Sequence, residues 1–393
     1  MTDRAIRHSD EHWMALAIQL ARKGQYSADP NPRVGCVLVK GGQLIGEGWH
    51  RKAGGPHAEI EALNHARAAN NDVTGATAYV TLEPCSHQGR TPPCCDALIK
   101  AGISKVIAAI EDPNPQVRGN GFERLRLAGT EVITGVLQAD AETLIPGYIK
   151  RHKAGLPLVR LKLAMSLDGR TAMANGESQW ITGPDARQDV QRWRARSSAI
   201  VTGIGSLLKD NPQLNVRRDD LAIEVEQEVE QAIEQTAFIR QPLRVVMDSE
   251  LRTPVDAKIL YQPGDTLIVG SQLKTCGQAG QDKQKQLQDS GAEVVLIEER
   301  NEQLDLHKTL QMLAQRGCNE VLFECGATLA GSVVQQGLAD EIIIYMAPTL
   351  LGNNAQPLMK LLGLDHIDQQ IHLTIQQTRM VGKDLRMIAT TKH

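Results

Sequence analysis

The sequence has few aromatic residues, no surplus of one charge sign and no long apolar run. Aromatic residues make up 3% of the 393 residues, so any core must be built largely from Leu, Ile, Val and Ala. The chain has 43 Lys and Arg residues and 46 Asp and Glu residues, so it lacks the basic excess typical of proteins that bind nucleic acid through its phosphates. Apolar runs such as residues 341–351 are too short to span a bilayer. We therefore expect neither a nucleic-acid nor a membrane partner.

The amino-terminal residues, MTDRAIRHSDEHWM, carry acids where a secretory signal needs an apolar stretch, so we expect a cytoplasmic protein. Seven cysteines in a reducing compartment argue against a disulfide framework and favour metal binding or catalysis. Three of them, Cys85, Cys94 and Cys95, fall within a few residues of one another. The adjacent pair, Cys94 and Cys95, could form a disulfide only with strain.

Strands alternate with helices in both halves, which predicts α/β layered domains. At about 100–200 residues per domain the length favours two domains. Residues 144–157, LIPGYIKRHKAGLP, are basic and weakly periodic and form the candidate linker, so we predict domains over residues 1–150 and 151–393. The predicted elements of the first domain are a helix capped by Asp10, strands over 34–39 and 42–50, a helix over 56–69 with Pro56 in its first turn, a strand over 77–84, a helix over 94–102 and a strand over 105–112.

The second half begins with a strand over 158–166 and a helix that starts at Pro184, and it ends in a hairpin over 372–391. Further strand and helix patterns alternate between these elements. The segment LAIEVEQEVEQAIEQ, residues 221–235, carries five glutamates. This acidic insert is best interpreted as a solvated helix, with a lid or partner surface as the alternative.

A catalytic zinc site is indicated by three residues in order. His57 opens a predicted helix, Cys85 follows a predicted strand, and Cys94 begins the next helix. One imidazole and two thiolates leave the fourth position of a tetrahedral zinc ion open for water. A purely structural site would need a fourth ligand. His87 could supply it chemically, but two residues after Cys85 it is better interpreted as a substrate contact or as an exposed loop residue, and these two interpretations are equal.

Glu59, two residues after His57, points elsewhere on the helix and can reach a metal-bound water rather than the metal. The order H-x-E followed by P-C and a later Cys is that of zinc-dependent base deaminases. Here eight residues separate the two cysteines, instead of the usual two. The intervening loop is therefore expected to bulge out toward the substrate.

The run PCSHQGRTPPC (84–94) resembles the deaminase half of the bifunctional deaminase/reductase family of riboflavin biosynthesis. NPRVGCVLV (31–39), PHAEIEAL (56–63) and DPNPQVRGNG (112–121) agree with it, as do LKLAMSLDGRTA (161–172), GESQWITG (176–183), DNPQLNVR (210–217) and ECGATLAGS (324–332). The resemblance covers nearly the whole chain. It implies a cytidine-deaminase-like three-layer domain followed by a dihydrofolate-reductase-like α/β domain. One departure is IPGY at 145–148, where the family usually shows Asn and then Gly-Phe.

The resemblance assigns the second thiolate ligand to Cys94, directly after TPP, and leaves Cys95 as a packed or idle helix residue. It also implies that Asn31 and His50 contact the substrate, while His87 stays a candidate substrate contact from its place in the loop between the cysteines. An amide such as Asn31 can pair with a pyrimidine edge as donor and acceptor at once.

In the second half, glycine-bearing turns at 203–205 and 324–332 could bind phosphate at helix starts or could be structural turns. Neither completes the Rossmann fingerprint. The resemblance implies NADPH, and the implied cofactor contacts are Ala164, Trp180, Ser206, Asp210, Gly326, Ala327, Thr328, Leu329 and Ala330. The implied substrate contacts are Ser178, Arg194, Leu214, Arg217 and Glu324. Arg194 and Arg217 suit a sugar phosphate, although without the resemblance Arg194 would be interpreted as an exposed helix residue.

The implied activity is hydrolytic, zinc-dependent removal of the 2-amino group of 2,5-diamino-6-(5-phosphoribosylamino)pyrimidin-4-one, followed by NADPH-dependent reduction of ribosyl to ribityl. The partner is then a small pyrimidine ribosyl phosphate, and a homo-oligomer, dimer or tetramer, is expected through the reductase domain. A nucleoside or tRNA base deaminase with an accessory domain is the alternative enzyme, and it would not use NADPH. A zinc-stabilised binding module is the alternative outside enzymes, in which Glu59→Gln would change nothing.

Overall fold

The computed structural model describes residues 9–87, 92–217, 220–221 and 240–391. The chain forms two compact units that divide after Gly155. All but the first residue of the acidic insert lies outside the described residues, so its interpretation as a solvated helix stays a prediction. The predicted boundary between residues 150 and 151 also stays a prediction.

The first unit is built on a five-stranded sheet with the order β2-β1-β3-β4-β5. Its strands are β1 (Gly35–Lys40), β2 (Gln43–Trp49), β3 (Thr77–Leu82), β4 (Lys105–Ile110) and β5 (Glu131–Thr134). β1 is antiparallel to β2 and β3, whereas β3, β4 and β5 are parallel. The carboxyl ends of β3 and β4 therefore meet at one edge of the sheet.

Helices cover both faces of this sheet and give the expected three layers. The helices are α1 (Asp10–Arg22), α2 (Ala58–Ala68), α3 (Cys94–Lys100), α4 (Asn120–Leu127), α5 (Gln138–Glu142) and α6 (Pro146–Ala154). Apolar residues of α1, α5 and α6 share one core, and those of α2, α3 and α4 share the other. Gly48 of β2 lets α2 approach closely, because a Cβ there would lie 2.4 Å from the Ala62 nitrogen.

Three local predictions differ from the structure. Ser9, not Asp10, caps α1, and its hydroxyl accepts from the His12 N–H. Pro56 precedes α2, whose N-cap is His57. The expected linker forms α6, because Leu144, Ile145 and Tyr148 are buried in the core of the first unit. Weak helical periodicity concealed this helix.

The second unit holds a nine-stranded sheet with the order β11-β10-β9-β8-β14-β6-β15-β18-β17. Its strands are β6 (Leu158–Ser166), β8 (Ala199–Gly203), β9 (Leu243–Met247), β10 (Thr266–Ser271), β11 (Glu293–Ile297), β14 (Glu320–Glu324), β15 (Glu341–Ala347), β17 (Leu373–Val381) and β18 (Asp384–Thr391). The strands from β11 to β15 in this order run parallel, and β18 and β17 form the expected hairpin. Two short pairs lie outside the sheet: β7 (Arg170–Ala172) with β16 (Gln356–Pro357), and β12 (Glu299–Arg300) with β13 (Gln303–Leu304).

Helices again pack on both faces of the large sheet. They are α7 (Pro184–Arg196), α8 (Ile204–Asp210), α10 (Gln278–Asp289), α11 (Leu306–Gln315) and α12 (Ala327–Gln335), with 3-10 turns η2 (Lys258–Tyr261) and η3 (Ile367–Gln369). α11 and α12 share one core, and α7, α8 and α10 share the other. Two layers of helices on a central, mostly parallel sheet confirm the predicted α/β class.

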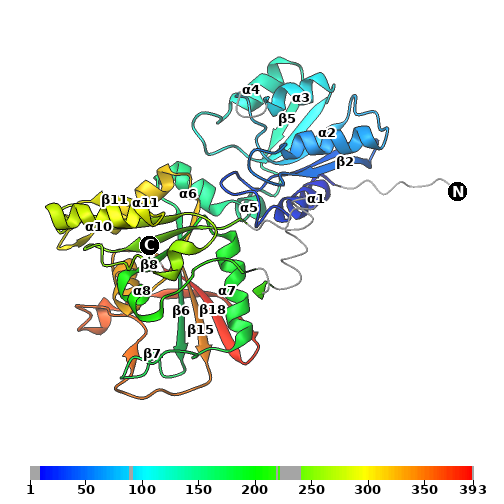
Figure 1. The fold of residues 1–393 in the computed structure, drawn as a ribbon. Helices are drawn as coiled ribbons and strands as arrows, with labels where there is room; N and C mark the ends of the chain where they lie inside the picture. Colours follow the sequence, from blue (N-terminus) through cyan, green and yellow to red (C-terminus); the bar gives the residue numbers. More distant parts are fainter. Residues whose placement is uncertain (1–8, 88–91, 218–219, 222–239, 392–393) are drawn as a thin grey trace. The chain divides into compact units, whose positions relative to one another are not determined.

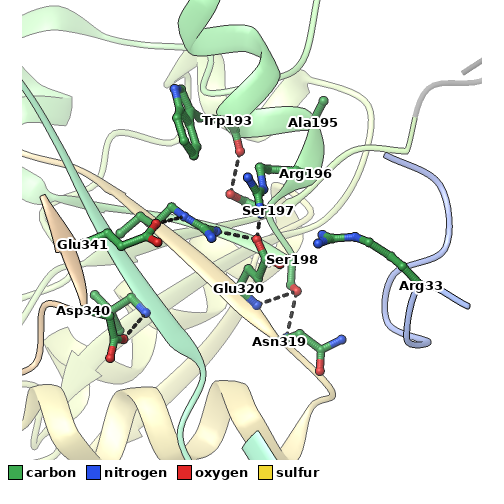
Figure 2. A network of polar contacts seen from close by, with 12 residues as sticks. Arg33, Trp193, Ala195, Arg196, Ser197, Ser198, Asn319, Glu320, Asp340 and Glu341 are labelled. Atoms are coloured by element: carbon green, nitrogen blue, oxygen red, sulfur yellow. Dashed lines mark hydrogen bonds and ion pairs between the residues drawn. The ribbon is translucent and has the colours of Figure 1, made fainter. Parts of the chain in front are cut away.

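A buried charge network lies at the amino ends of the central strands of this sheet (Figure 2). The Arg160 guanidinium of β6 donates to both Glu320 and Glu341, and Arg196 donates to Glu320 at 3.1 Å. Arg160 and Glu320 are each 2% exposed. Removing one partner of such a pair leaves an uncompensated charge in the interior, which is strongly destabilising.

We expect Glu320→Gln to lower the free energy of unfolding of the second unit by roughly 3–5 kcal/mol, because Arg160 loses its buried carboxylate. Urea unfolding, with hydrogen exchange of the β6 and β14 amides, measures this loss. The matched control is Glu293→Gln, because Glu293 forms an ion pair with Arg316 at the surface. Equal stability of the two variants would show that the network contributes little.

Candidate active sites

The three predicted zinc ligands come together where α2, β3 and α3 meet. His57 is the N-cap of α2, Cys85 follows β3 in the loop after Leu82, and Cys94 is the first residue of α3. The His57 Nδ1 lies 3.6 Å from the Cys85 Sγ and 3.3 Å from the Cys94 Sγ. The three ligand atoms all lie within 4.8 Å of one another.

These distances fit a zinc ion. Tetrahedral zinc, bonded at about 2.3 Å to sulfur and about 2.0 Å to nitrogen, holds such ligand atoms roughly 3.5 Å apart. The donor set, one imidazole and two thiols, is also the soft set that zinc prefers. His87 is exposed and is not part of this cluster. The described residues therefore offer three ligands and leave one position open.

The two sulfur atoms are chemically unequal. The contact with Cys94 lowers the pKa of the Cys85 thiol and raises that of Cys94. The backbone N–H of Cys94 also donates to the Cys85 Sγ at 3.3 Å. An N–H donor favours the thiolate form of Cys85, and both thiols release their protons when they bind a metal ion.

Glu59 lies in the first turn of α2 and is 3% exposed. Burial raises the pKa of its carboxyl to about 7, and the neighbouring Cys85 sulfur adds to the rise. A carboxyl group with such a pKa can both accept and return a proton near neutrality. This is the property that the predicted proton shuttle requires.

Asn31 and His50 form a linked pair. The His50 Nδ1 donates to the Pro56 carbonyl at 2.9 Å, which leaves Nε2 as an acceptor for the Asn31 amide at 3.0 Å. His50 is 2% exposed, and burial lowers its pKa, so the ring is neutral. The Asn31 carbonyl oxygen and its second N–H stay available for a pyrimidine edge.

Glu83 is a buried residue that the sequence analysis did not single out. Its carboxylate accepts from the backbone N–H groups of Asp112, Gly119, Gly121 and Phe122. Gly121 is required here, because a Cβ would lie 2.1 Å from the Pro84 carbonyl oxygen. Glu83 therefore fixes the loop after β4 against the loop of Cys85. In the sequence, the position of Glu83 between a predicted strand and Pro84 was the feature that could have identified it as a site residue.

These residues share one cavity of about 660 Å³. Its lining includes the predicted residues Asn31, His50, His57, Glu59, Cys85 and His87. It also includes residues absent from the predicted site: Glu83, Asp112, Asn114, Tyr148, Arg151 and His152. The last three belong to α6, so the supposed linker forms a wall of the cavity.

In the second unit the structure brings Arg194 and Glu324 together. Arg194 donates through Nε and Nη2 to the two Glu324 oxygens at 2.6 and 2.9 Å. Burial opposes ionisation of Glu324, but Arg194 and Lys162 outweigh it and lower the pKa of the carboxyl. The Arg194 side chain is 11% exposed, which argues against the alternative of an exposed helix residue, and its contact with substrate stays a prediction.

Lys162 is the residue that the sequence analysis missed in this unit. It is the register partner of Glu324 in the parallel pair β6 and β14, and its Nζ lies 5.9 Å from the centre of the Tyr345 ring. Burial lowers the pKa of the Lys162 ammonium group. The Arg194 charge lowers it further, whereas the Glu324 charge raises it. A lysine within the apolar strand LVRLKLAMS was the signal, because buried parallel strands rarely carry a charge without a partner.

The predicted cofactor turn lies beside Ser206. Gly326 is the N-cap of α12, and Ala327 to Ala330 form its first turn. A Cβ on Gly326 would lie 3.3 Å from the Ser206 hydroxyl, a tight contact that glycine avoids. The first N–H groups of a helix have no intrahelical partner and suit the phosphates of a dinucleotide such as NADPH. The residues present therefore fit that cofactor.

The remaining predicted residues are less tightly grouped. Arg217 is partly exposed, pairs with Asp220 and helps to lower the pKa of Glu324. Leu214 is buried with a positive φ of 49°. The other positions are Ala164 in β6, Ser178 in the loop before α7, exposed Trp180 with Arg187 over its ring, and exposed Asp210 at the end of α8.

A three-layer unit with a His-Cys-Cys metal cluster and a buried glutamate defines the class of zinc-dependent base deaminases. Residues 7–110 match the family described as the cytidine and deoxycytidylate deaminase zinc-binding region, and residues 157–387 match the RibD C-terminal domain. The chain belongs to the RibD family. It contains both a deaminase domain and a reductase domain, which confirms the predicted bifunctional enzyme of riboflavin biosynthesis and its cofactors, zinc and NADPH.

Full-length relatives support this membership. The riboflavin biosynthesis protein RibD of Escherichia coli is 46% identical over 376 residues, covering 96% of this chain and 98% of the relative. That of Haemophilus influenzae is 44% identical, covering 97% of each. The solved structure of Acinetobacter baumannii RibD superposes with a TM-score of 0.85 at 44% identity, covering 98% of this chain and 99% of its own. Within the described residues, no helix is long and apolar enough to cross a membrane.

We expect Cys94→Ser to lower zinc affinity by at least roughly tenfold, because a ligand is lost, whereas Cys95→Ser retains the metal. The Cys95 thiol donates to the Pro84 carbonyl at 3.1 Å and to the Gly121 carbonyl, away from the cluster. Zinc per chain, measured by mass spectrometry after dialysis against a chelator, separates the variants. Equal zinc loss in both would contradict the choice of Cys94.

Proposed function

We propose that the first unit removes the 2-amino group of 2,5-diamino-6-(5-phosphoribosylamino)pyrimidin-4-one as ammonia and that the second reduces the ribosyl group of the product to ribityl. The observation that carries the deaminase assignment is the shared cavity. It places Glu59, the His57 and Cys85 ligands and the Asn31–His50 pair around one space. A solved relative from Thermotoga maritima, 30% identical with a TM-score of 0.80 over 98% of this chain and 99% of its own, is described as a deaminase/reductase with this chemistry.

In the deaminase site, His57, Cys85 and Cys94 would hold zinc, which would supply a water acidic enough to react near neutral pH. Asn31 orients the pyrimidine edge, with its amide fixed by His50. Glu59 accepts a proton from the attacking water and returns it to the departing amine. The burial of Glu59 supports this double role, because it raises the pKa of the carboxyl to about 7.

In the reductase site, Gly326 and Ser206 would hold NADPH, which would supply the hydride for C1′ of the sugar. Opening the ribose ring also requires a proton at the ring oxygen. Lys162 is our candidate donor, because it is partly buried beside Glu324 and Arg194 and has a lowered pKa. Arg217, partly exposed near Glu324, is the candidate ligand of the sugar phosphate, since guanidinium binds phosphate in a bidentate manner.

The assignment is tested by a mass-spectrometric product assay on the diaminopyrimidine ribosyl phosphate, with and without NADPH. Exchange of an amine for oxygen without NADPH, and gain of two hydrogens only with it, supports both activities and their order. Activity on cytidine or adenosine instead would favour a nucleoside deaminase. We also propose that the enzyme works in the cytoplasm as a homo-oligomer assembled through its reductase unit, which light scattering of the purified chain tests.

We expect Glu59→Gln to lower the deamination rate by roughly 10²–10⁴-fold, because the variant cannot carry the proton. Zinc content and reduction of the deaminated intermediate should be unchanged, since Glu59 is not a ligand and lies in the first unit. Glu61, on the same helix and paired with Arg51, supplies the matched control Glu61→Gln. Full activity of Glu59→Gln would favour a binding module over an enzyme.

We expect Lys162→Met to lower the kcat of the reductase by at least roughly 10²-fold while leaving deamination intact, because the ring oxygen loses its proton donor. Fluorescence titration with NADPH should give an unchanged Kd, which separates a chemical role from cofactor binding. A normal kcat in Lys162→Met would remove Lys162 from the chemistry.

Arg217→Ala should instead raise the reductase KM for the phosphorylated substrate with little change in kcat.

A further inference from the structure

The deaminase cavity is larger than a pyrimidine base needs. At about 660 Å³ it lies in the middle of the range for pockets that enclose whole drug-sized ligands. The candidate metal ligands and the Asn31–His50 pair are sufficient to bind the pyrimidine base and its amino group. The wall formed by α6, with Tyr148, Arg151 and His152, has no role in that chemistry.

Arg151 is the positively charged residue of this wall, and its guanidinium has few hydrogen-bond partners. Its side chain lines the cavity and is partly buried, and its Nε is buried without a hydrogen-bond partner. Among the residues that the structure describes, no carboxylate lies within ion-pair distance of it. Arg124 of α4 and Arg194 of α7, by contrast, each pair with a carboxylate. A partly buried guanidinium without an anion is costly, and such a group suits an anionic ligand.

Neighbouring rings hold the Arg151 side chain in place. Its guanidinium carbon lies 5.6 Å from the centre of the Tyr148 ring, and its Nη2 lies 3.3 Å from the His152 Nε2. The rings of Tyr148 and His152 pack edge to face at 4.5 Å. The guanidinium is therefore oriented before a ligand arrives, which lowers the entropy cost of binding.

Tyr148 also forms a hydrogen bond with Asp112, an acidic residue that follows β4 and lines the same cavity. Its hydroxyl donates to an Asp112 oxygen at 3.2 Å, and the Asn114 N–H donates to the same oxygen at 2.8 Å. Asp112 thus lines the cavity with its carboxylate already engaged, and no ion pair joins it to Arg151 in the described part of the chain. The hydroxyl at residue 148 is the feature that separates this chain from the Gly-Phe pattern expected at 147–148.

We propose that Arg151, held by Tyr148 and His152, is the phosphate-binding residue of the deaminase cavity and recognises the phosphate monoester of the ribosyl phosphate substrate. This inference rests on the proposed deaminase function and extends it. It makes the first unit selective for the phosphorylated substrate over the free riboside, independently of the phosphate ligand in the reductase.

The test compares deamination of the ribosyl phosphate and of its dephosphorylated riboside by the zinc-loaded, full-length chain without NADPH. With Arg151→Gln, kcat/KM should fall roughly 10- to 100-fold for the phosphorylated substrate, the contribution of a charged hydrogen-bonded contact, and less than about twofold for the riboside. Inorganic phosphate should inhibit wild-type deamination competitively and should lose this effect in the variant.

Lys153→Gln is the matched control, because Lys153 is an exposed cation of the same helix that does not line the cavity. Lys153→Gln should leave kcat/KM unchanged for both substrates. Zinc content and reductase turnover confirm that each variant is folded. Should Arg151→Gln fail to fold, Arg151→Lys replaces it, and it should retain charge but lose part of the preference for phosphate.

An equal fall for both substrates would overturn the inference and make Arg151 a support of the cavity wall. Unchanged kinetics on the phosphorylated substrate would also overturn it. If the zinc-loaded wild type deaminates neither compound, the proposed deaminase function itself fails, and the phosphate subsite fails with it. Deamination of both compounds at equal efficiency by the wild type would leave the deaminase standing without this subsite.

Discussion

The carboxyl ends of parallel strands decide where both sites of this protein lie. In the first unit, Cys85 and Asp112 follow the parallel strands β3 and β4 and therefore meet at one edge. In the second unit, β8 and β14 lead directly into α8 and α12, so Ser206 and Gly326 become neighbours. Loops that leave one edge of a rigid sheet can be placed precisely while the strands carry the stability. Each site is thus a consequence of strand direction.

Buried charges serve two different purposes in these sheets. Around Arg160 and Glu320, at the amino ends of the strands, each of the charges has an internal partner (Figure 2). Glu83 is similarly satisfied, by backbone N–H groups, and it ties two site loops together. Lys162 and Arg151 differ, because Lys162 is partly buried with a lowered pKa, and Arg151 lines a cavity and has a buried Nε–H without a hydrogen-bond partner. Such incomplete compensation is characteristic of functional positions.

The helix α6 shows how the tertiary structure changes the meaning of a segment. Its basic, glycine- and proline-containing sequence is typical of a linker, and its apolar residues are too few to give a clear period. Yet Leu144, Ile145 and Tyr148 are buried, and Arg33 donates to the Leu144 carbonyl at 2.8 Å across 111 residues of sequence. A local pattern cannot reveal a helix whose start is fixed by so distant a side chain. The same helix supplies a wall of the deaminase cavity.

The sequence by itself determined the order of the elements from α1 to β4, the limits of β6, and the grouping of His57, Cys85 and Cys94 as candidate zinc ligands with Glu59 beside them. These follow from local periodicity and from ligand spacing, which are properties of short segments. Only the tertiary structure decided which charges face one another. The Arg194–Glu324 pair joins residues 130 positions apart, and Glu83 binds amides up to 39 positions away. Such contacts depend on strand register and helix packing, which set distances that no local pattern contains.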